Sequence, residues 1–522
     1  MEKKRGVIKI MKRVLALVLA LGLTLTAAAC GAGTVPSGTN PSNSPSSSAP
    51  SQTSEATEKP RVTFRILNSY TDKDPNTDNS VKVLEEGTGY DLQIDLLPQQ
   101  GALDKLNLIF ASGDVDYDYI KMGTDDQSKS AYITYAKKGL ITDITDLLPN
   151  YSNLNGIDPL GKEAVTVDGR IYAISSTGLP IPLENNMFRK DWLDALGLSV
   201  PATKEELYNV LKTLKDKDPG NLGKDLVPFS VMPGAINSTI SQFFGFIYSY
   251  EDRNGALVDT RLTPDYREYL SYMKSLYTEG LLDPDYPILS SSSFMEKIAA
   301  GKVAYYNGWV DPARDYQAKM TSEGKDGVYF QAAEPFKAPD GVQRTTTQKG
   351  LFMIGILPSG SDKTADVLQF IDNYLEPAAF KSMIHGEEGV DYKMVDGKEI
   401  PIIPAFDENR GNLSAFFPIQ DGDSYFPLWT VRTRKTAEYT VIFESIVKVA
   451  YDYQVVNPLA FAPSFESISA EMKIVNDYAI EQAVKFIAGA RSLDEFDAYV
   501  EEMNIKGADK ILTTINEWYA QK

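Results

Sequence analysis

Apolar residues recur along positions 61–174 with two alternating periods, one typical of strands and one typical of helices. "RVTFRIL" (61–67) predicts a first strand, because β-branched and apolar residues alternate with basic ones. Residues 80–98 predict a helix followed by a second strand, and residues 104–123 predict a helix that ends near 113, followed by a third strand. Residues 130–149 predict another helix, and "RIYAI" (170–174) predicts a further strand. Strands that alternate with helices indicate an α/β fold with a mainly parallel sheet.

Helix signals dominate the later part of the chain. Residues 188–219 predict two helices, the second opening with a capping box formed by Thr203 and Glu206. Residues 262–284 predict a long helix with Thr263 as N-cap and Pro264 in the first position. The C-terminal 60 residues read as helical, with a further capping box at Ser492 and Glu495.

The N-terminal pattern differs from the rest. A basic segment (1–13) precedes the 16-residue apolar run "VLALVLALGLTLTAAA". A membrane-spanning helix needs about 20 apolar residues, so this pattern predicts a secretory signal peptide over 1–29. Translation from Met1 and from Met11 both fit the pattern.

Residues 31–60 are rich in serine, proline, threonine and glycine and contain no aromatic residue. Such a segment cannot bury enough apolar surface to fold, so we expect a disordered tether. Its root-mean-square span would be on the order of 30 Å.

Cys30, the single cysteine, directly follows Ala27, Ala28 and Ala29. This junction resembles the bacterial lipobox, whose cysteine is acylated and becomes the mature N-terminus; the lipobox usually has Leu where this chain has Ala27. The resemblance implies a lipoprotein held at the outer face of the cell membrane, since two or more acyl chains anchor a protein stably. The alternative is ordinary secretion with an unmodified cysteine.

The formal charge of the chain is −19, and the predicted signal peptide contains six basic residues and one acidic residue. Its removal leaves a charge near −24. This acidity excludes a nucleic-acid-binding function, which needs a basic face.

Catalytic patterns are sparse. His385 is the only histidine, which argues against Ser-His-Asp, Cys-His and histidine-rich zinc chemistry, and it is expected at the surface or in a loop. Asp114, Asp116 and Asp118 alternate along the chain, so a glycosidase that uses two of these carboxylates stays an alternative. We predict no catalytic residue, no metal and no cofactor.

One stretch has the spacing of a calcium-binding loop. Asp74, Asn76, Asp78 and Glu85 would occupy loop positions 1, 3, 5 and 12. Asn79 stands where the loop needs glycine, so Asp78 or Asn79 capping the following helix is the simpler explanation.

Four stretches resemble segments of the extracellular solute-binding lipoproteins of carbohydrate-type ABC importers. They are "FRKDWLDALGLSVPATKEEL" (188–207), "LYTEGLLDPD" (276–285), "GEEGVDYKM" (386–394) and "KFIAGARSLDEFDAYV" (485–500), in which Phe496 stands where the family commonly has Trp. The resemblance covers residues 61–522.

That resemblance implies a two-lobed periplasmic-binding-protein-like fold with a hinge, each lobe a mainly parallel sheet flanked by helices. It places the N-terminal lobe at about 61–176 plus 351–440, and the C-terminal lobe at about 177–350 plus 441–522. The first crossing between lobes is expected in "ISSTGLPIP" (174–182) and the second near "TTTQKGLFMIG" (345–355).

Two tryptophans are candidate sugar-stacking residues, since aromatic planes match the flat faces of sugars. Trp309 follows the predicted strand "GKVAYYNG" and Gly308, in a segment that resembles the "NG-x-W" segment of maltodextrin-binding proteins. Trp429, in "YFPLWTVR", is an open case between packing and ligand contact, whereas Trp192 and Trp518 are predicted to pack.

Polar residues that follow strands or the first crossing complete the predicted site, with solvated loops as the alternative for each. They are Asn68, Tyr70, Asp72, Asp125, Gln127, Glu184 and Asn185.

The resemblance implies a monomeric, lipid-anchored protein that captures an oligosaccharide and delivers it to the permease subunits of an ABC importer. The alternatives are a surface-anchored glycosidase or lyase that uses a carboxylate pair, and a receptor for peptides or polyamines.

Overall fold

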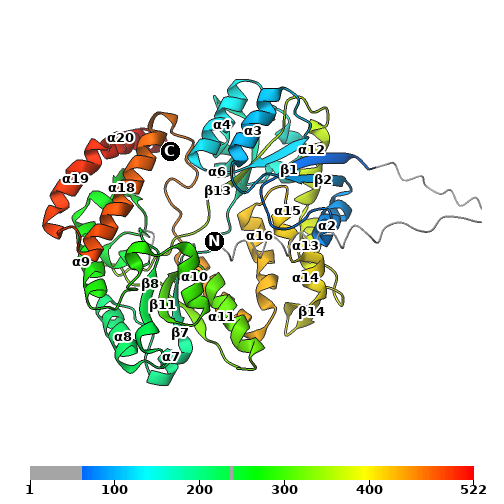
Figure 1. Cartoon of the computed structure of the whole chain (residues 1–522). Helices are drawn as coiled ribbons and strands as arrows, with labels where there is room; N and C mark the ends of the chain where they lie inside the picture. The colour runs from blue at the N-terminus through cyan, green and yellow to red at the C-terminus, as the bar shows by residue number, and fades with distance from the viewer. Residues whose placement is uncertain (1–60, 183, 235–238) are drawn as a thin grey trace, which may run out of the picture. The chain divides into compact units, whose positions relative to one another are not determined.

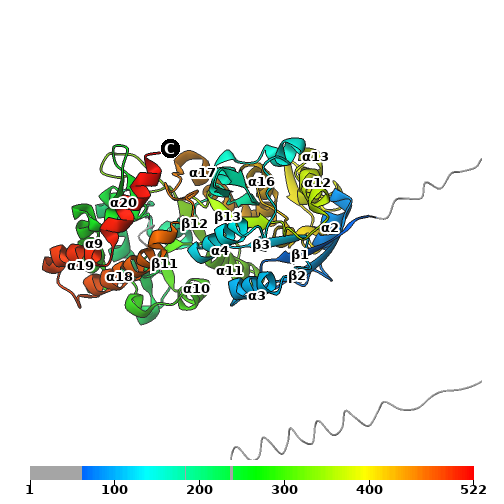
Figure 2. The same cartoon turned by 90° about the horizontal axis from the view of Figure 1, so that it is seen from above.

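The computed structural model describes residues 61–182, 184–234 and 239–522. The predicted signal peptide, Cys30 and the predicted tether lie outside these described residues. Within Pro60–Lys522, which is one compact unit, two larger sheets carry helices on both faces (Figures 1 and 2). No helix among the described residues is long and apolar enough to cross a membrane.

The first sheet has five strands. In spatial order they are β2 (Asp91–Leu96), β1 (Thr63–Asn68), β3 (Tyr119–Met122), β13 (Leu351–Ile356) and β6 (Ala173–Thr177). One face, with Phe64 and Ile66, packs against α2 (Asn79–Thr88), α12 (Thr364–Tyr374) and α13 (Pro377–His385). The other face, with Leu67, packs against α3 (Ala102–Ser112) and α4 (Asp126–Lys137). We call this sheet and its helices the first lobe.

The second sheet has four strands, in the order β12 (Phe330–Ala333), β7 (Asn185–Arg189), β11 (Val303–Gly308) and β8 (Val227–Val231). On one face the rings of Phe188 and Tyr305 stack at 4.2 Å under α8 (Lys204–Lys217), α9 (Pro264–Thr278) and α18 (Ser469–Ala488). The other face packs against α10 (Ser291–Ala299), α11 (Asp311–Ser322) and α17 (Ala437–Tyr453). We call this sheet and its helices the second lobe.

The remaining described helices and strands are shorter or lie at the periphery. They are α5 (Ser152–Asn155), α6 (Pro159–Ala164), α7 (Lys190–Leu196), α14 (Ala405–Arg410), α15 (Leu413–Phe416), α16 (Gly422–Trp429), α19 (Phe496–Ile505), α20 (Ala508–Tyr519), β4 (Thr166–Val167), β5 (Arg170–Ile171), β9 (Tyr250–Asp252), β10 (Leu257–Asp259), β14 (Tyr392–Val395) and β15 (Lys398–Pro401).

Both larger sheets are mainly parallel, as expected, and each contains one strand that runs against the others. β1 pairs in parallel with β2 and β3, but β13 pairs antiparallel with β3 and β6. In the second sheet β11 is parallel to β8, whereas β7 is antiparallel to β11 and β12. The reason is connectivity: β13 and β7 enter their sheets directly after a crossing from the other lobe, so no crossover helix brings them round in the parallel sense.

Two of the chain segments that cross between the lobes lie side by side. Gly178 of the first crossing donates its backbone N–H to Gly350 of the second at 3.0 Å, and Gln348 donates to Ile181 at 2.8 Å. The segment around Ala460, which connects α17 to α18 within the second lobe, joins the other side of the second crossing, because Leu351 donates to Ala460 at 3.0 Å. The two crossings and this segment therefore form one hydrogen-bonded ribbon with the second crossing in the middle.

Most predicted helices and strands are confirmed, including the capping boxes at Thr203 and Ser492. The predicted strand 170–174 is instead two strands that break at Tyr172. β5 pairs with β4 in a small hairpin, and β6 pairs with β13 in the first sheet, so the chain changes partner within this stretch.

His385 corrects the expectation of a surface or loop residue. It ends α13 and is buried, with Nδ1 2.7 Å from a carboxylate oxygen of Glu399 and Nε2 3.1 Å from the carbonyl oxygen of Leu428. Burial lowers the pKa of His385, although Glu399 opposes this shift. The last turn of α13 is covered by β15 and α16, which is why the side chain is enclosed.

Candidate functional site

In each sheet the chain crosses to the other lobe at one end of the strands. We call the row of strand ends on that side the crossing-side edge of the sheet. In the first sheet this edge holds the start of β13 and therefore the ends of β3 and β1, since β13 runs antiparallel to β3. In the second sheet it holds the start of β7 and the end of β11, because Asn185 pairs with Gly308. Binding sites in α/β folds form at such strand ends, where the chain passes from one group of strands to another.

Trp309 lies at the crossing-side edge of the second sheet, immediately after β11. Its side chain is 42% exposed, and its carbonyl oxygen accepts a hydrogen bond from the Tyr306 hydroxyl at 2.9 Å. A Cβ on Gly308 would come within 3.1 Å of the ring of Phe294, so glycine fits the strand end closely. An exposed indole on a held backbone is a suitable stacking platform for a sugar ring.

Trp429 lies elsewhere, at the end of α16. Its ring stacks on Phe426 at 6.0 Å and meets Phe443 of α17 edge-on at 5.9 Å. It packs against hydrophobic clusters of both lobes. Packing against these residues accounts for the position of the Trp429 ring. A contact between Trp429 and a ligand stays a prediction.

The residues that follow β1 divide into a buried and an exposed set. Asn68 is buried, and its amide nitrogen donates to the carbonyl oxygen of Ala415 at 2.9 Å. Tyr70 is 49% exposed and, with Asp72, lines an open depression of about 460 Å³ beside the end of β2. Asp72 pairs with Lys73 at 3.2 Å.

A buried polar cluster occupies the crossing-side edge of the second sheet. Asn186 Oδ1 accepts hydrogen bonds from Tyr305, at 2.8 Å, and from Thr239. Asn307 donates to Thr239 at 2.9 Å. Asn185, on the opposite face, donates to the carbonyl oxygen of Gly308 at 3.5 Å. Side chains fixed in this way form a rigid wall.

Glu184 precedes this cluster directly. Its Oε2 is buried and has no hydrogen-bond partner among the described residues. Burial raises the pKa of Glu184 to about 8. An unpaired buried carboxyl group is costly in the free protein, which favours a ligand that supplies the missing contact.

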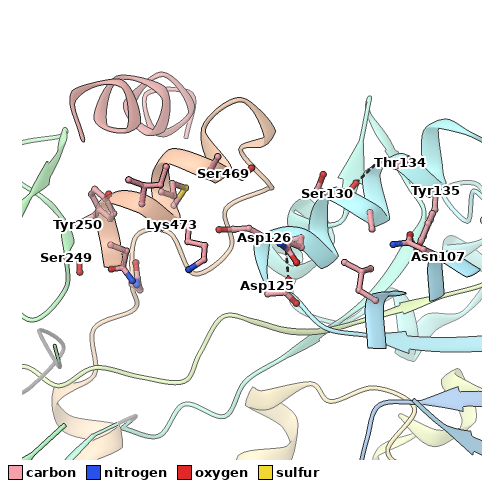
Figure 3. A pocket seen from close by; sticks show the side chains of 18 of the residues that line it. Asn107, Asp125, Asp126, Ser130, Thr134, Tyr135, Ser249, Tyr250, Ser469 and Lys473 are labelled. Carbon is pink, nitrogen blue, oxygen red and sulfur yellow. Dashed lines mark hydrogen bonds between the residues drawn. The ribbon is translucent and has the colours of Figure 1, made fainter. Parts of the chain in front are cut away.

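A cavity with a volume of about 1190 Å³ lies between the lobes (Figure 3). Helices α3 and α4 of the first lobe line one side with Asn107, Ser130 and Tyr135, and α18 of the second lobe lines the other with Ser469 and Lys473. This volume exceeds that of typical small-molecule pockets and suits an oligosaccharide.

Two predicted site residues, Asp125 and Gln127, line this cavity. Asp125 is the N-cap of α4 and accepts from the backbone N–H groups of Gln127 and Ser128 and, at 2.6 Å, from the Ser128 hydroxyl. Burial raises the pKa of Asp125, but these hydrogen bonds outweigh it and hold the pKa below its ordinary value. The structure thus joins Asp125 and Gln127 at one cavity and places Trp309, Glu184 and Asn185 at the edge of the second sheet.

Sequence reasoning missed Arg261, Tyr250 and Asn476 on the second-lobe side of the cavity. Arg261 is almost completely buried and makes a bidentate pair with Asp259, with Nη2 2.6 Å from Oδ2. It also donates to the Tyr250 hydroxyl at 3.0 Å and to Asn476 at 3.3 Å. No pattern in the sequence brings these three positions together, because they come from separate segments.

Phe352 was also missed. It lies at the start of β13, at the crossing-side edge of the first sheet, and is 53% exposed. Its carbonyl oxygen accepts from the Thr124 hydroxyl at 3.3 Å. The exposure of Phe352 could not be predicted because every residue of "LFMI" is apolar, so no alternation of apolar and polar residues marks the outward-facing position.

Comparison with known proteins identifies the family of the chain. Residues 71–379, more than half of the chain, match the family described as bacterial extracellular solute-binding proteins. The chain belongs to this family.

Two relatives from Bacillus subtilis align over most of their length. The polygalacturonan/rhamnogalacturonan-binding protein YtcQ is 26% identical over 86% of this chain and 89% of its own. Lipoprotein LipO is 25% identical over 90% of this chain and 94% of its own. The fructooligosaccharide ABC transporter substrate-binding protein FusA of Streptococcus pneumoniae is 32% identical over 48% of this chain and 50% of its own.

Solved structures show the same fold at low identity. FusA in complex with kestose superposes with a TM-score of 0.64 at 21% identity, covering 88% of this chain and 99% of that one. The alginate-binding protein AlgQ2 without calcium ion gives a TM-score of 0.62 at 20% identity, covering 89% of this chain and 98% of that one. The α/β, two-lobed solute-binding fold is therefore confirmed.

Membership of this family makes the chain a binding protein rather than an enzyme. Two of the three aspartates considered for a carboxylate pair have structural partners. Asp116 pairs with Arg65, and Asp118 accepts from the Arg65 backbone at 2.9 Å and pairs with Lys363 at 3.1 Å.

The calcium-loop pattern near Asp74 also has a structural explanation. Asp78 caps α2 by accepting from the backbone of Ser80 at 2.9 Å, as the simpler interpretation predicted, and Asp74 accepts from Asn76 at 3.0 Å. Across residues 61–182, 184–234 and 239–522, no group of three or more metal-ligating His, Cys, Asp or Glu side chains occurs.

Proposed function

We propose that this solute-binding protein captures an oligosaccharide between its two lobes and delivers it to the permease of an ABC importer. The observation that carries the proposal is the cavity of about 1190 Å³ with walls from helices of both lobes. The names of YtcQ and FusA, which bind polygalacturonan or rhamnogalacturonan and fructooligosaccharide, support a carbohydrate ligand. The exposed aromatic residues Trp309, Phe352 and Tyr70 at the crossing-side edges support the same ligand class.

Hinge closure is the proposed mechanism. A ligand that contacts both lobes stabilises the closed state, which the permease then recognises. The moving bodies are residues 61–176 plus 351–440 and residues 177–350 plus 441–522, and backbone hydrogen bonds tie the first crossing between them to the second. Micromolar affinity requires about −8 kcal/mol, which a stacked ring and several hydrogen bonds supply.

Anchoring through Cys30 to the outer face of the cell membrane is part of the proposal. It is supported by the lipobox-like junction before Cys30 and by the name of the lipoprotein relative LipO. We propose that the protein acts as a monomer, since one chain supplies both walls of the cavity.

A thermal-shift panel tests this function. The purified protein is screened against oligosaccharides, peptides and polyamines, and a true ligand at 100 times its Kd adds about 2.7 kcal/mol to stability. We expect stabilisation by one oligosaccharide class, with no products after prolonged incubation. Stabilisation by peptides or polyamines alone, or turnover of the sugar, would contradict the proposal.

A further inference from the structure

We infer that Asn476 of α18 and Tyr250 of β9 donate hydrogen bonds to the oligosaccharide on the second-lobe side of the cavity, and that Arg261 is the positioning residue for both. All three residues line the cavity. This inference rests on the proposed function and names the contacts of that same site. Two observations carry it: the contacts that Arg261 makes, and the donors that are left without a partner around the cavity.

Arg261 is held in place by one carboxylate. Asp259 ends β10, and both Asp259 and Arg261 are almost completely buried. The guanidinium group donates from Nε to Oδ1 of Asp259 at 2.8 Å and from Nη2 to Oδ2 at 2.6 Å. A bidentate, charge-assisted pair of this kind fixes the plane of the guanidinium group.

The fixed guanidinium group contacts two other chain segments. Its Nη2 donates to the Tyr250 hydroxyl at 3.0 Å, and its central carbon lies 5.2 Å from the centre of the Tyr250 ring. Its Nη1 donates to Oδ1 of Asn476 at 3.3 Å. Arg261 therefore sets the positions of a side chain from β9 and of one from α18.

These contacts decide which groups of Tyr250 and Asn476 stay available. An arginine side chain only donates hydrogen bonds, so Asn476 must turn Oδ1 towards Arg261 and its Nδ2 away from it. Tyr250 likewise accepts from Arg261 and keeps its own O–H as a donor. Neither this O–H nor Nδ2 of Asn476 has an acceptor among the described residues. A ligand in the cavity can supply the acceptors.

Two further asparagines that line the cavity show the same pattern. Oδ1 of Asn457 accepts from the backbone N–H of Leu459 at 2.9 Å, and a backbone N–H only donates. Oδ1 of Asn107, on the first-lobe side in Figure 3, accepts from the Tyr135 hydroxyl at 2.7 Å. In both residues Nδ2 has no acceptor among the described residues. The asparagines thus use their oxygens within the protein and leave their N–H groups for the cavity.

Donors that are fixed in direction suit an oligosaccharide, because its hydroxyl and ring oxygens accept hydrogen bonds. A side chain that is already held in its binding geometry loses less conformational entropy when the ligand arrives. The Tyr250 hydroxyl gains in addition, since accepting from Arg261 polarises its O–H bond and strengthens it as a donor. Arg261 thereby raises the affinity through Asn476 and Tyr250.

Calorimetric titration of the purified protein tests the two donors. Five trisaccharides serve as probes, namely cellotriose, kestose, galactotriose, xylotriose and trigalacturonic acid, and the variants are measured with the one that binds the wild type most tightly. Asn476→Ala should weaken its binding about fivefold. Asn476→Asp should bind no better than Asn476→Ala, because the aspartate keeps an acceptor for Arg261 but has no N–H donor.

Matched controls separate the donors from general effects of substitution. Asn504→Ala and Asn504→Asp change an exposed asparagine of α19 that does not line the cavity, and both should bind within about twofold of the wild type. Tyr250→Phe should weaken binding about fivefold, whereas Tyr451→Phe, at an exposed position of α17, should not. Asn476→Asp that binds like the wild type, or Tyr250→Phe that does, would overturn the role of that residue.

Arg261→Lys tests positioning, because lysine keeps the charge beside Asp259 but lacks the planar set of N–H groups. It should weaken binding about tenfold in the wild-type background and less than about twofold in the Asn476→Ala, Tyr250→Phe double variant. Equal losses in the two backgrounds would overturn the positioning role, and if Arg261→Lys does not fold, the variants at Asn476 and Tyr250 decide the inference. Wild-type binding that those variants leave unchanged would overturn this inference alone, whereas a wild type that binds none of the five trisaccharides would contradict the proposed function.

Discussion

The backbone N–H of Gly178 donates to the carbonyl oxygen of Gly350 at 3.0 Å, which ties the first crossing between the lobes to the second. A Cβ at position 178 would lie 2.0 Å from the carbonyl oxygen of Gln348. The backbones can approach this closely because neither Gly178 nor Gly350 has a side chain. The hinge is therefore a packed ribbon of backbone rather than a loose linker.

Gly178→Ala should destabilise the protein by about 2 kcal/mol or more, because the new methyl group meets backbone that cannot rotate away. Denaturant unfolding measures the loss. Gly360→Ala is the matched control, since a Cβ there has no neighbour within 4 Å, and it should change the free energy of unfolding by less than about 0.5 kcal/mol. Equal stability of the two variants would mean that the crossings are not packed as described.

Glu184→Gln should change how stability depends on pH. Burial raises the pKa of Glu184 to about 8, so the folded protein retains a proton that the unfolded chain releases above about pH 4.5. Stability contributed by the protonated group is therefore lost as pH rises toward 8. The variant should match the wild type near pH 4 and exceed it by a few kcal/mol near pH 9.

Unfolding free energies measured across this pH range check the prediction. Glu517→Gln, at an exposed position of α20, serves as the control and should give a difference that does not vary with pH. A flat difference for Glu184→Gln as well would show that the carboxyl group is solvated or paired.

Trp309→Ala should weaken ligand binding by roughly 1–3 kcal/mol and leave the melting temperature nearly unchanged, because its side chain is exposed at the wall of the site. Trp309→Phe should recover part of the affinity by restoring an aromatic plane. Calorimetry and thermal unfolding are measured on both variants. A large fall in melting temperature with unaltered affinity would assign Trp309 to packing.

Cys30→Ser should release the protein from membranes into the medium, because the acylated thiol is the proposed anchor. Immunoblots of membrane and medium fractions measure the distribution. Ser37→Ala, in the same low-complexity segment, should leave the protein with the membrane. A Cys30→Ser variant that stays membrane-bound would remove the lipid anchor from the account.

Local patterns along the sequence predicted much of the fold. The capping boxes at Thr203 and Ser492 and the strand at β1 depend on neighbouring residues, and all three are confirmed. The reversed direction of β13 and β7 was not predicted, because it depends on where the chain re-enters each sheet after a crossing. The enclosure of His385 depends on β15 and α16, which contact it only in the folded chain.

The site was predicted less completely than the fold. A residue that follows a strand can be picked out from sequence, and the positions of Trp309, Asp125 and Gln127 after their strands were predicted in this way. Arg261 lines the cavity together with Asn476, which contacts it from α18. Sequence patterns carry no record of such distant partners, and an apolar run likewise concealed the exposure of Phe352.

Small-angle X-ray scattering with and without a saturating ligand tests the central claim most directly, namely that an oligosaccharide binds between two lobes that close on it. The account predicts a smaller radius of gyration in the complex, together with one ligand bound per chain. A radius that stays unchanged at full occupancy would contradict closure of the lobes around the ligand.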